Sequence, residues 1–377
     1  MTSRERLSRA MARGIPDRVP VMCQMSIGHI LLQAGGSPCE LWNSGPLFTE
    51  ALLRLRSQYG FDGILVSLHG HRPDWPTEVR IISRNADGEV VDWKNGDRTV
   101  FPFDDLPRHQ PASPKPTPDL SRFDPASTPD VIDHIPVSQG LDFILDPASL
   151  FDIFDTFGER GERSFSLHGE VTSPFDYFLH LFGFQQAITG LVEDPGRCRH
   201  ILDILTEGVC RIAAGMADHG ADAVKISSPF AGAGFIPPQF YSDFVAPYEG
   251  RIVRQLRGSG TFTYLHTCGA VNDRLEMMTE TGADGIECLD PPPLGDVRLA
   301  EAKARIGSRV FIKGNVDPVH VLLSGNRRQI LSETKSCLRA GMPGGGYILS
   351  TACSIAPHTP SRNIVLLVEA AERWGWY

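Results

Sequence analysis

The chain has 377 residues, of which 41% are hydrophobic and 21% are charged. This composition is ordinary for a folded globular protein, and it excludes a disordered chain, a collagen-like fibre and a disulfide-stabilised miniprotein. The 36 basic and 45 acidic residues give a net charge of −9, which argues against nonspecific binding to nucleic acid or to an anionic membrane, because both need a basic face.

The N-terminal segment and the cysteines point to a cytoplasmic protein. The segment MTSRERLSRAMARGIPDRVP is charged from Arg4 onward and lacks the apolar core of a signal peptide. No run of about 18 apolar residues occurs in the chain, so we expect no membrane span. The 8 cysteines are scattered without a CxxC pair, which is typical of reduced thiols that are mostly buried as small apolar residues.

Short β-rich runs recur along the chain with helical segments between them, a pattern that indicates parallel βαβ units. The eight predicted strands cover residues 19–25, 62–68, 164–171, 221–229, 262–269, 283–290, 310–318 and 347–355. Helical periodicity is clearest at 187–220, 317–341 and 360–375. We therefore predict a (β/α)8 TIM barrel, an α/β fold formed as a single domain by residues 1–377.

Residues 72–137 interrupt this rhythm, and we interpret them as an insertion after the second strand. Within it, residues 79–93 alternate around an Asp-Gly pair and predict a hairpin. Residues 107–129 are rich in proline and predict an extended surface segment. Residues 141–158 are assigned to the helix before the third strand, although they could contain a further strand.

Functional residues of such barrels gather where the strands end, and this rule selects a set of metal donors. His266 and Cys268 form an H-x-C pair on the fifth strand, where residues two apart face the same side. Glu287 ends the sixth strand, and Cys353 lies near the end of the last. Nitrogen, sulfur and oxygen donors of this kind suit tetrahedral zinc, whereas magnesium and calcium prefer oxygen.

The sequence leaves two questions about this ligand set unanswered. Cys288 competes with Glu287 for the fourth position, because side chains alternate along a strand and only one of two neighbours faces the barrel mouth. The pair of His266 and Cys268 also fits an ordinary buried core, where free cysteine is common.

Four further polar residues stand near strand ends. His168 on the third strand and Lys225 on the fourth are candidate catalytic residues, as substrate contacts or proton donors. Asn315 and Asp317 end the seventh strand in the motif GNVDP. They either bind the cofactor or only fix the loop, because Asn and Asp are common turn residues.

Three segments carry a resemblance to a known family: RERLSRAMARGIPDRVPV, the run from ADGIECLD to FIKGNVDP, and YILSTACSIAPHTPSRNIVLLVEAA. With them the chain resembles the uroporphyrinogen decarboxylase superfamily, and this resemblance implies a (β/α)8 barrel. The decarboxylases of the superfamily bind four-armed porphyrinogens through arginines after the first strand. Here that stretch, residues 22–36, contains no arginine.

The zinc methyltransferases of the superfamily share an H-x-C motif and a distant cysteine, which His266, Cys268 and Cys353 match one for one. A looser similarity to cobalamin-independent methionine synthase implies Glu287 as the fourth ligand. A catalytic zinc needs an exchangeable position, and a carboxylate is the ligand that yields most readily, so Glu287 is also a candidate catalytic group that substrate displaces. The resemblance thus implies Zn²⁺ and methyl transfer between a small molecule, either a thiol or a methyl ether, and a corrinoid.

No segment resembles a cobalamin-binding domain, and the motif D-x-H-x-x-G is absent, so the corrinoid is expected on a separate partner protein. Two alternatives remain open: a tetrapyrrole decarboxylase of the uroporphyrinogen type, and a non-catalytic barrel that binds a corrinoid or a partner. A homodimer is also possible.

Overall fold

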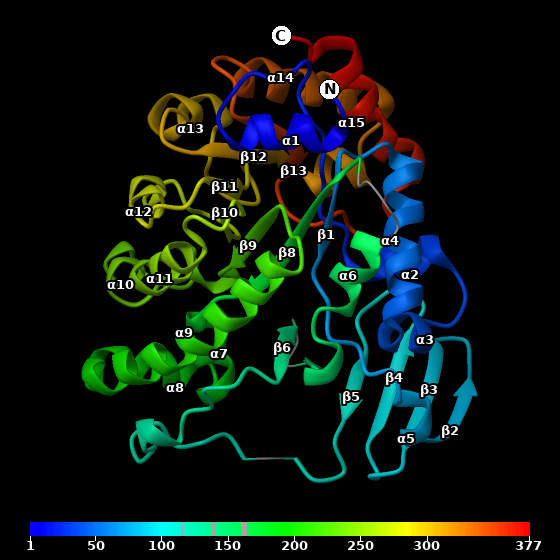
Figure 1. Ribbon diagram of the computed structural model, residues 1–377, viewed down its shortest axis with the longest axis vertical. Helices are drawn as coiled ribbons and strands as arrows, with labels where there is room; N and C mark the ends of the chain where they lie inside the picture. The colour runs from blue at the N-terminus through cyan, green and yellow to red at the C-terminus, as the bar shows by residue number, and fades with distance from the viewer. Residues whose placement is uncertain (115, 138–140, 160–163) are drawn as a thin grey trace.

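The computed structural model describes residues 1–114, 116–137, 141–159 and 164–377, and its centre is a curled parallel sheet of seven strands (Figure 1). In spatial order the strands are β1 (Gly63–Val66), β8 (Ser166–Thr172), β9 (Ala223–Ser227), β10 (Phe262–Thr267), β11 (Gly285–Cys288), β12 (Phe311–Val316) and β13 (Tyr347–Thr351). Every residue of β9, β11, β12 and β13 is buried, as expected for a parallel sheet that is covered on both faces. These seven strands correspond to the second to eighth predicted runs, and β8 alone extends beyond its run, by one residue.

The prediction of a regular first strand at residues 19–25 is wrong, because this segment forms no ladder. An isolated parallel bridge joins Val21 to Leu349 of β13, and the amide of Asp62, just before β1, donates to the carbonyl of Val21 at 2.8 Å. The segment therefore runs between β13 and β1, where the eighth strand of a barrel is expected, but the parallel sheet has seven strands among the described residues.

Two features of the chain interrupt this pairing. A second bridge joins Met25 to Ile355, so the two bridges are four residues apart on one segment and six apart on the other. Pro20 lacks an N–H and cannot donate to a ladder. The extra residues beyond β13 include Cys353, which therefore lies in an irregular segment instead of a strand.

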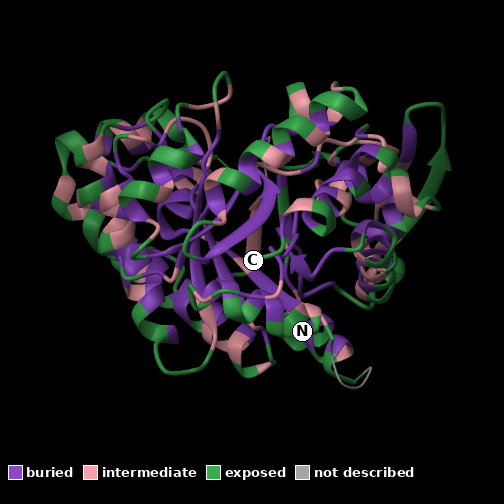
Figure 2. Cartoon of the chain, turned by 90° about the horizontal axis from the view of Figure 1, so that it is seen from above, coloured by how far each residue is buried: buried purple, intermediate pink, exposed green. Residues whose placement is uncertain are grey.

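Helices follow the strands along the chain, and Figure 2 shows the buried residues gathered in the interior and the exposed ones on the outer helix faces. The helices are α4 (Gly45–Tyr59), α6 (Asp152–Glu159), α7 (Pro174–Phe182), α8 (Phe184–Glu193), α9 (Pro195–Asp218), α10 (Pro238–Phe244), α11 (Ala246–Leu256), α12 (Leu275–Glu280), α13 (Leu299–Ile306), α14 (Arg327–Gly341) and α15 (Ser361–Trp374). The last predicted helix corresponds to α15, and the one predicted at 317–341 is a π-helical turn, Pro318–Leu323, followed by α14.

The helical run predicted at 187–220 is divided in two at Asp194, which follows α8 and caps α9. Its carboxylate accepts a hydrogen bond from the amide of Arg197 at 3.0 Å, and Pro195 occupies the first turn of α9. No helix among the described residues has both the length and the hydropathy that crossing a bilayer requires.

The N-terminal helix α1 (Ser3–Met11) covers the amino ends of the strands. Its buried Leu7 and Met11 belong to one apolar cluster with Leu65, Tyr264 and Phe311 of the sheet. Two short helices, α2 (Ile27–Ala34) and α3 (Pro38–Asn43), then lead to α4. The amino end of the sheet is thus filled with apolar side chains, and the opposite end remains for chemistry.

A buried ion-pair network holds α1 against the start of β1. The carboxylate of Asp62, fully buried, accepts hydrogen bonds from Arg6 at 2.7 Å, from Arg18 at 3.2 Å and from the amide of Val21 at 2.8 Å. Removal of one partner leaves buried charges without compensation, which typically costs about 3–5 kcal/mol.

We therefore expect Asp62→Ala to lower the free energy of unfolding by about 3–5 kcal/mol, as measured by denaturant titration. Asp92→Ala serves as the control, because Asp92 pairs with a half-exposed Arg98 at the surface, where an ion pair adds little to stability. Equal, small losses in both variants would contradict this account.

Between β1 and β8 the chain forms a separate antiparallel sheet, next to α3 in Figure 1. Its order is β2 (Val79–Arg84), β3 (Gly88–Trp93), β4 (Arg98–Pro102) and β5 (Arg108–Gln110), preceded by the short α5 (Trp75–Glu78). β2 and β3 are the hairpin predicted at 79–93, whose turn is closed by Asn85 accepting from the amides of Asp87 and Gly88. β4 and β5 extend it beyond what the sequence pattern indicated.

The helix predicted over residues 141–158 is wrong in its first half. Residues Leu141–Ile144 form strand β7, which pairs with β6 (His134–Val137), and the helix α6 begins only at Asp152. Burial alternates along β7, with Leu141 and Phe143 inside, and this period of two is typical of a strand. The proline-rich segment 107–129 is exposed for most of its described length.

Candidate metal centre

The strand register brings polar side chains close together on five neighbouring strands, β8 to β12. His266 of β10 lies opposite Glu287 of β11, which in turn lies opposite Lys313 of β12. On the other side, Glu170 of β8 lies opposite Lys225 of β9. The sheet therefore presents one histidine, two carboxylates and two lysines side by side.

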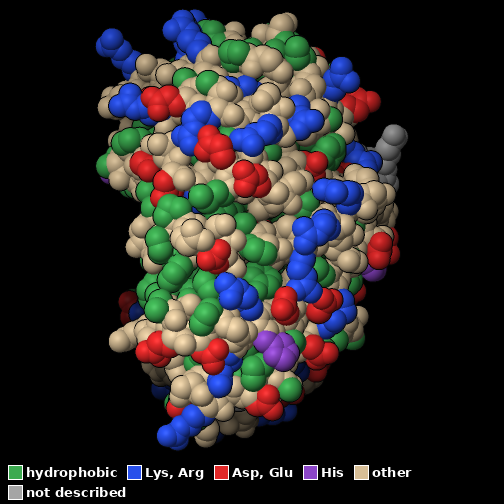
Figure 3. All heavy atoms as spheres, turned by 90° about the vertical axis from the view of Figure 1, so that its left-hand side faces the viewer, with side chains coloured by type: hydrophobic (Ala, Val, Ile, Leu, Met, Phe, Trp, Pro, Cys, Tyr) green, Lys and Arg blue, Asp and Glu red, His purple; other side chains and the backbone are tan. Residues whose placement is uncertain are grey.

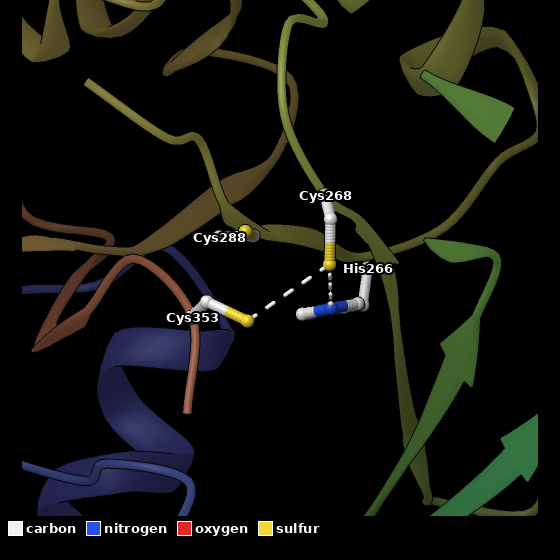
Figure 4. Close-up of side chains that lie close together, drawn as sticks. All are labelled: His266, Cys268, Cys288 and Cys353. Atoms are coloured by element: carbon white, nitrogen blue, oxygen red, sulfur yellow. Dashed lines mark hydrogen bonds between the residues drawn. The ribbon is translucent and has the colours of Figure 1, made fainter. Parts of the chain in front are cut away.

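Four soft donor atoms meet at this end of the sheet (Figure 4). His266, Cys268, Cys288 and Cys353 each offer one donor atom, and all four atoms lie within 4.8 Å of one another. The Nε2 of His266 is 3.2 Å from the Sγ of Cys268, which is 3.9 Å from the Sγ of Cys353. The structure thus brings together three of the four predicted ligands.

This donor set fits zinc. One imidazole nitrogen and three sulfurs form a thiolate-rich group for a tetrahedral ion, and they do not suit calcium or magnesium, which prefer oxygen. Hydrogen bonds from Cys268 and Cys288 hold the pKa of Cys353 well below its usual range, whereas burial raises the pKa of Cys288 well above it.

Cys288 joins the group because strand alternation ends at this residue. Cys288 and Leu289 have φ angles of 77° and 57°, in the left-handed region that side chains rarely adopt. The turn lets Glu287 and Cys288, neighbours in sequence, both lie beside His266, and neither of them lines the cavity described below. The thiol of Cys288 also donates to Asp290 at 3.2 Å.

Glu287 is not one of the four donors. It contacts the other imidazole nitrogen of His266, Nδ1, on the side away from the sulfurs. Its Oε1 accepts from Nδ1 of His266 at 2.8 Å and lies 3.1 Å from Nζ of Lys225, while Oε2 pairs with Lys313. Burial alone would raise the pKa of Glu287, but the two ammonium groups outweigh it and hold that pKa well below its usual range. The proton on Nδ1 leaves Nε2 free to bind a metal.

A cavity of about 720 Å³ opens onto this group. His266, Cys268 and Cys353 line the cavity, whereas Cys288 is not among its lining residues and is only 1% exposed. Three donors are therefore reachable from the cavity, and the fourth is buried behind them.

Lys225 lines the cavity, as predicted for a substrate contact, but its ammonium group is already engaged. It donates to Gln24 at 2.6 Å and pairs with Glu170 and Glu287, both at 3.1 Å. Burial would lower the pKa of Lys225, but the two carboxylates raise it above its ordinary value. The group therefore stays charged near neutral pH and does not suit proton donation.

The structure does not bring His168, Asn315 and Asp317 to the cavity lining. His168 is fully buried, with ring nitrogens 3.1 Å from Tyr264 Oη and 3.1 Å from Ser166 Oγ. Asn315 donates to the carbonyl of Leu289 at 2.8 Å.

Asp317 caps the turn that follows β12. It accepts from the amides of Val319 and His320, both at 2.8 Å. The geometry of Asn315 and Asp317 fits the alternative in which they fix loops, and gives no support for cofactor binding.

Sequence reasoning missed two residues of the site. Lys313 pairs with Glu287, and the register of β11 and β12 could have indicated this only once the pairing was known. Asp176 lines the cavity and is 5% exposed. In the sequence it belongs to a Ser-Pro-Phe-Asp start of a helix, and it gives no signal beyond capping.

Fold and site together define an α/β protein with a thiolate-rich candidate metal centre at the carboxyl ends of its parallel strands. The family model for uroporphyrinogen decarboxylase (URO-D) matches residues 121–374. The chain belongs to this family, which confirms the resemblance seen in its motifs.

Curated relatives come from two groups of enzymes. The chain is 28% identical over 230 residues to "Methylcobamide:CoM methyltransferase MtbA" of Methanosarcina acetivorans, covering 60% of this chain and 64% of that protein. It is 33% identical over 173 residues to "Methylcobamide:CoM methyltransferase MtaA" of Methanosarcina barkeri, covering 46% and 48%. It is 29% identical over 189 residues to a uroporphyrinogen decarboxylase of Thioalkalivibrio sulfidiphilus, covering 49% and 51%. The matches thus span less than two thirds of these relatives.

Two solved structures share the fold. A methyltransferase from Methanosarcina mazei superimposes with a TM-score of 0.73 at 21% identity, over 99% of each chain. A B12-independent methionine synthase from Shewanella sp. W3-18-1 gives a TM-score of 0.51 at 11% identity, over 86% of each chain. At these identities the likeness concerns the fold alone.

Proposed function

We propose that the protein is a zinc-dependent methyltransferase that moves a methyl group between a small molecule and a corrinoid carried by a separate protein. The observation that carries this proposal is that three of four soft donors, His266, Cys268 and Cys353, line one cavity. The names of the MtbA and MtaA relatives, both methylcobamide:CoM methyltransferases, support the same chemistry. A cytoplasmic location and a homodimer stay predictions.

In this proposal His266, Cys268, Cys288 and Cys353 hold the ion, and Glu287 orients His266 from behind. A bound zinc supplies a Lewis acid and lowers the pKa of a coordinated thiol. A catalytic zinc needs a position that substrate can take. The position for substrate lies on the cavity side, where His266, Cys268 and Cys353 are reachable, and not at Glu287, which was first predicted to yield it.

The charged residues that line the cavity indicate which substrates it favours. Among the described lining residues Lys225 is the one lysine or arginine, and its partners already satisfy it. Asp105 and Glu170 add negative charge to the wall. A buried anion without a cationic partner is costly, so the cavity favours thiols or methyl ethers that carry no anionic group.

An apolar patch at the rim of the cavity supports docking of the corrinoid partner. Phe184, Phe230 and Phe235 line the cavity and are 40–46% exposed. Their ring centroids lie 5.1–6.4 Å apart. Figure 3 shows hydrophobic side chains gathered on the face of the molecule that carries α8 to α12. Exposed aromatic patches of this kind mark interaction surfaces.

Asp176 provides a proton in this scheme when the substrate is a methyl ether. Burial raises the pKa of Asp176 to about 7, and Ser173 donates to its Oδ2 at 2.6 Å. The acid form, present below that pH, can protonate a leaving oxygen. We expect kcat/KM for ether cleavage to fall as pH rises through about 7, and Asp176→Asn to abolish this dependence. An unchanged pH profile in the variant would exclude the role.

The proposed function is tested by following cobalt absorbance when the purified chain is mixed with a methylated corrinoid and a thiol, or with a reduced corrinoid and an aryl methyl ether. We expect demethylation or methylation of cobalt that requires zinc. Neutral 2-mercaptoethanol should react at least about tenfold faster than anionic 2-mercaptoethanesulfonate, because an unpaired buried charge costs several kcal/mol.

Two results would contradict the proposal, and a third would contradict only the argument from cavity charge. Metal binding without transfer to or from any compound tested would favour the non-catalytic barrel. Release of carbon dioxide from uroporphyrinogen without metal would favour the decarboxylase. Faster reaction of the anionic thiol would leave the methyltransferase standing but refute the argument from cavity charge.

A further inference from the structure

A second group of donor side chains lies outside the metal centre. His134 of β6, Asp142 of β7 and His180 in the last turn of α7 each offer one donor atom, and these atoms lie within 4.8 Å of one another. The Nε2 of His180 is 2.8 Å from Oδ1 of Asp142, and the two imidazole centroids are 5.2 Å apart. Among the described residues, this group and the metal centre are the two such clusters.

The imidazole of His134 is held in an orientation that suits a metal ligand. Its Nδ1 is 2.7 Å from the carboxylate of Asp133, which fixes the proton on that nitrogen. Its ring packs edge-on against Tyr177, whose hydroxyl donates to the carbonyl of His134 at 2.8 Å.

The other nitrogen of His134, Nε2, is buried and has no hydrogen-bond partner among the described residues. A buried polar atom without a partner is costly, and a cation beside Nε2 would remove that cost.

The other two ligands, Asp142 and His180, reach His134 from different elements. His134 pairs with Ile144 and Pro136 pairs with Asp142, so His134 and Asp142 lie diagonally on the same face of the two-stranded ribbon. His180 approaches that face from α7.

We propose that His134, Asp142 and His180 bind a divalent transition-metal ion such as zinc or cobalt. Two imidazoles and one carboxylate are a common ligand set for such ions, and the site contains no thiolate. The side chains of the two histidines are 26–27% exposed, which leaves a path from solvent. The site borders the large cavity, because His180, Pro136 and Val137 line it. A bound ion would join the β6–β7 ribbon to α7 at the cavity rim.

The test is a titration of the full-length protein with Co²⁺ after one equivalent of zinc has filled the thiolate centre. We expect one further equivalent of cobalt to bind, with visible d–d bands but without the near-ultraviolet charge-transfer band that cobalt–thiolate bonds give. His134→Gln and His180→Gln should each lose this equivalent and keep the zinc. His219→Gln is the matched control, because His219 pairs with Asp155 at 2.7 Å but belongs to no donor cluster among the described residues.

Asp133→Asn provides a milder variant, since Asp133 is 76% exposed and its loss does not threaten folding. We expect this variant to bind cobalt about tenfold or more weakly, as is typical when the carboxylate behind a ligating histidine is removed. The proposal would be overturned if the wild type bound no cobalt beyond the zinc centre, if the bound cobalt gave a thiolate band, or if the two histidine variants bound cobalt as the wild type does. None of these outcomes depends on methyl-transfer activity.

Discussion

Replacement of either Cys268 or Cys353 with alanine is expected to abolish stoichiometric zinc binding and to reduce methyl transfer by more than about 100-fold, because even the loss of a residue behind a metal ligand can cost that much. Both sulfurs face the cavity and lie 3.9 Å apart, so each variant removes a donor on the substrate side of the ion. Elemental analysis of purified protein measures the first effect, and cobalt absorbance measures the second.

A buried cysteine elsewhere in the chain gives the matched control. Cys198 in α9 is fully buried and belongs to no donor cluster among the described residues, so Cys198→Ala should cost packing energy and leave the zinc content unchanged. Cys288→Ser distinguishes Cys288 from Glu287 as the fourth ligand. This variant should bind zinc more weakly if Cys288 is a donor, and as tightly as the wild type if Glu287 is. Full zinc retention in both Cys268→Ala and Cys353→Ala would remove the proposed site.

Glu287→Gln is expected to have the second-largest effect, on both stability and metal affinity. The carboxylate carries the charge that compensates the buried ammonium groups of Lys225 and Lys313, and it holds the proton on Nδ1 of His266. Its loss should lower the free energy of unfolding by about 3–5 kcal/mol, by analogy with other broken buried pairs. It should also weaken zinc binding about 10- to 100-fold, because the imidazole is no longer oriented.

A second buried glutamate serves as the comparison for this variant. Glu249 is also fully buried, but its partners are the hydroxyls of Ser228 and Tyr241, both at 2.6 Å, and burial raises its pKa. Glu249→Gln should therefore cost about 1–3 kcal/mol and leave zinc affinity unchanged. X-ray absorption at the zinc edge shows which atoms bind the ion. An oxygen ligand that is present in the wild type and lost in Glu287→Gln would mean that Glu287 binds zinc directly, which contradicts its role as the group that orients His266.

Much of the fold could be predicted because parallel strands that are buried on both faces give continuous apolar runs. The motif FTYLHTCG, for example, identified β10 and placed His266 and Cys268 together at its end. Residues 19–25 look like such a run, but Pro20 and a two-residue slip against β13 prevent a ladder. That slip arises from pairing between segments that are distant in sequence, and the local sequence pattern cannot predict it.

The site was only partly predictable for a related reason. Strand alternation correctly predicts which face a side chain takes within a strand. Cys288 lies where the backbone enters the left-handed region, and the sequence ECLD contains no glycine that would predict such a turn. The pairing of Glu287 with Lys313 likewise follows from the register of two strands, not from spacing along the chain. The H-x-C pair and the distant Cys353 were found because their residue types are rare and chemically specific.

The most direct test of the central claim is a crystal structure of the zinc-loaded protein with anomalous diffraction measured at the zinc edge. We predict a zinc peak about 2.3 Å from the sulfurs of Cys268, Cys288 and Cys353 and about 2.0–2.1 Å from Nε2 of His266. A structure in which Cys353 points away from His266, with no zinc peak between them, would contradict the account.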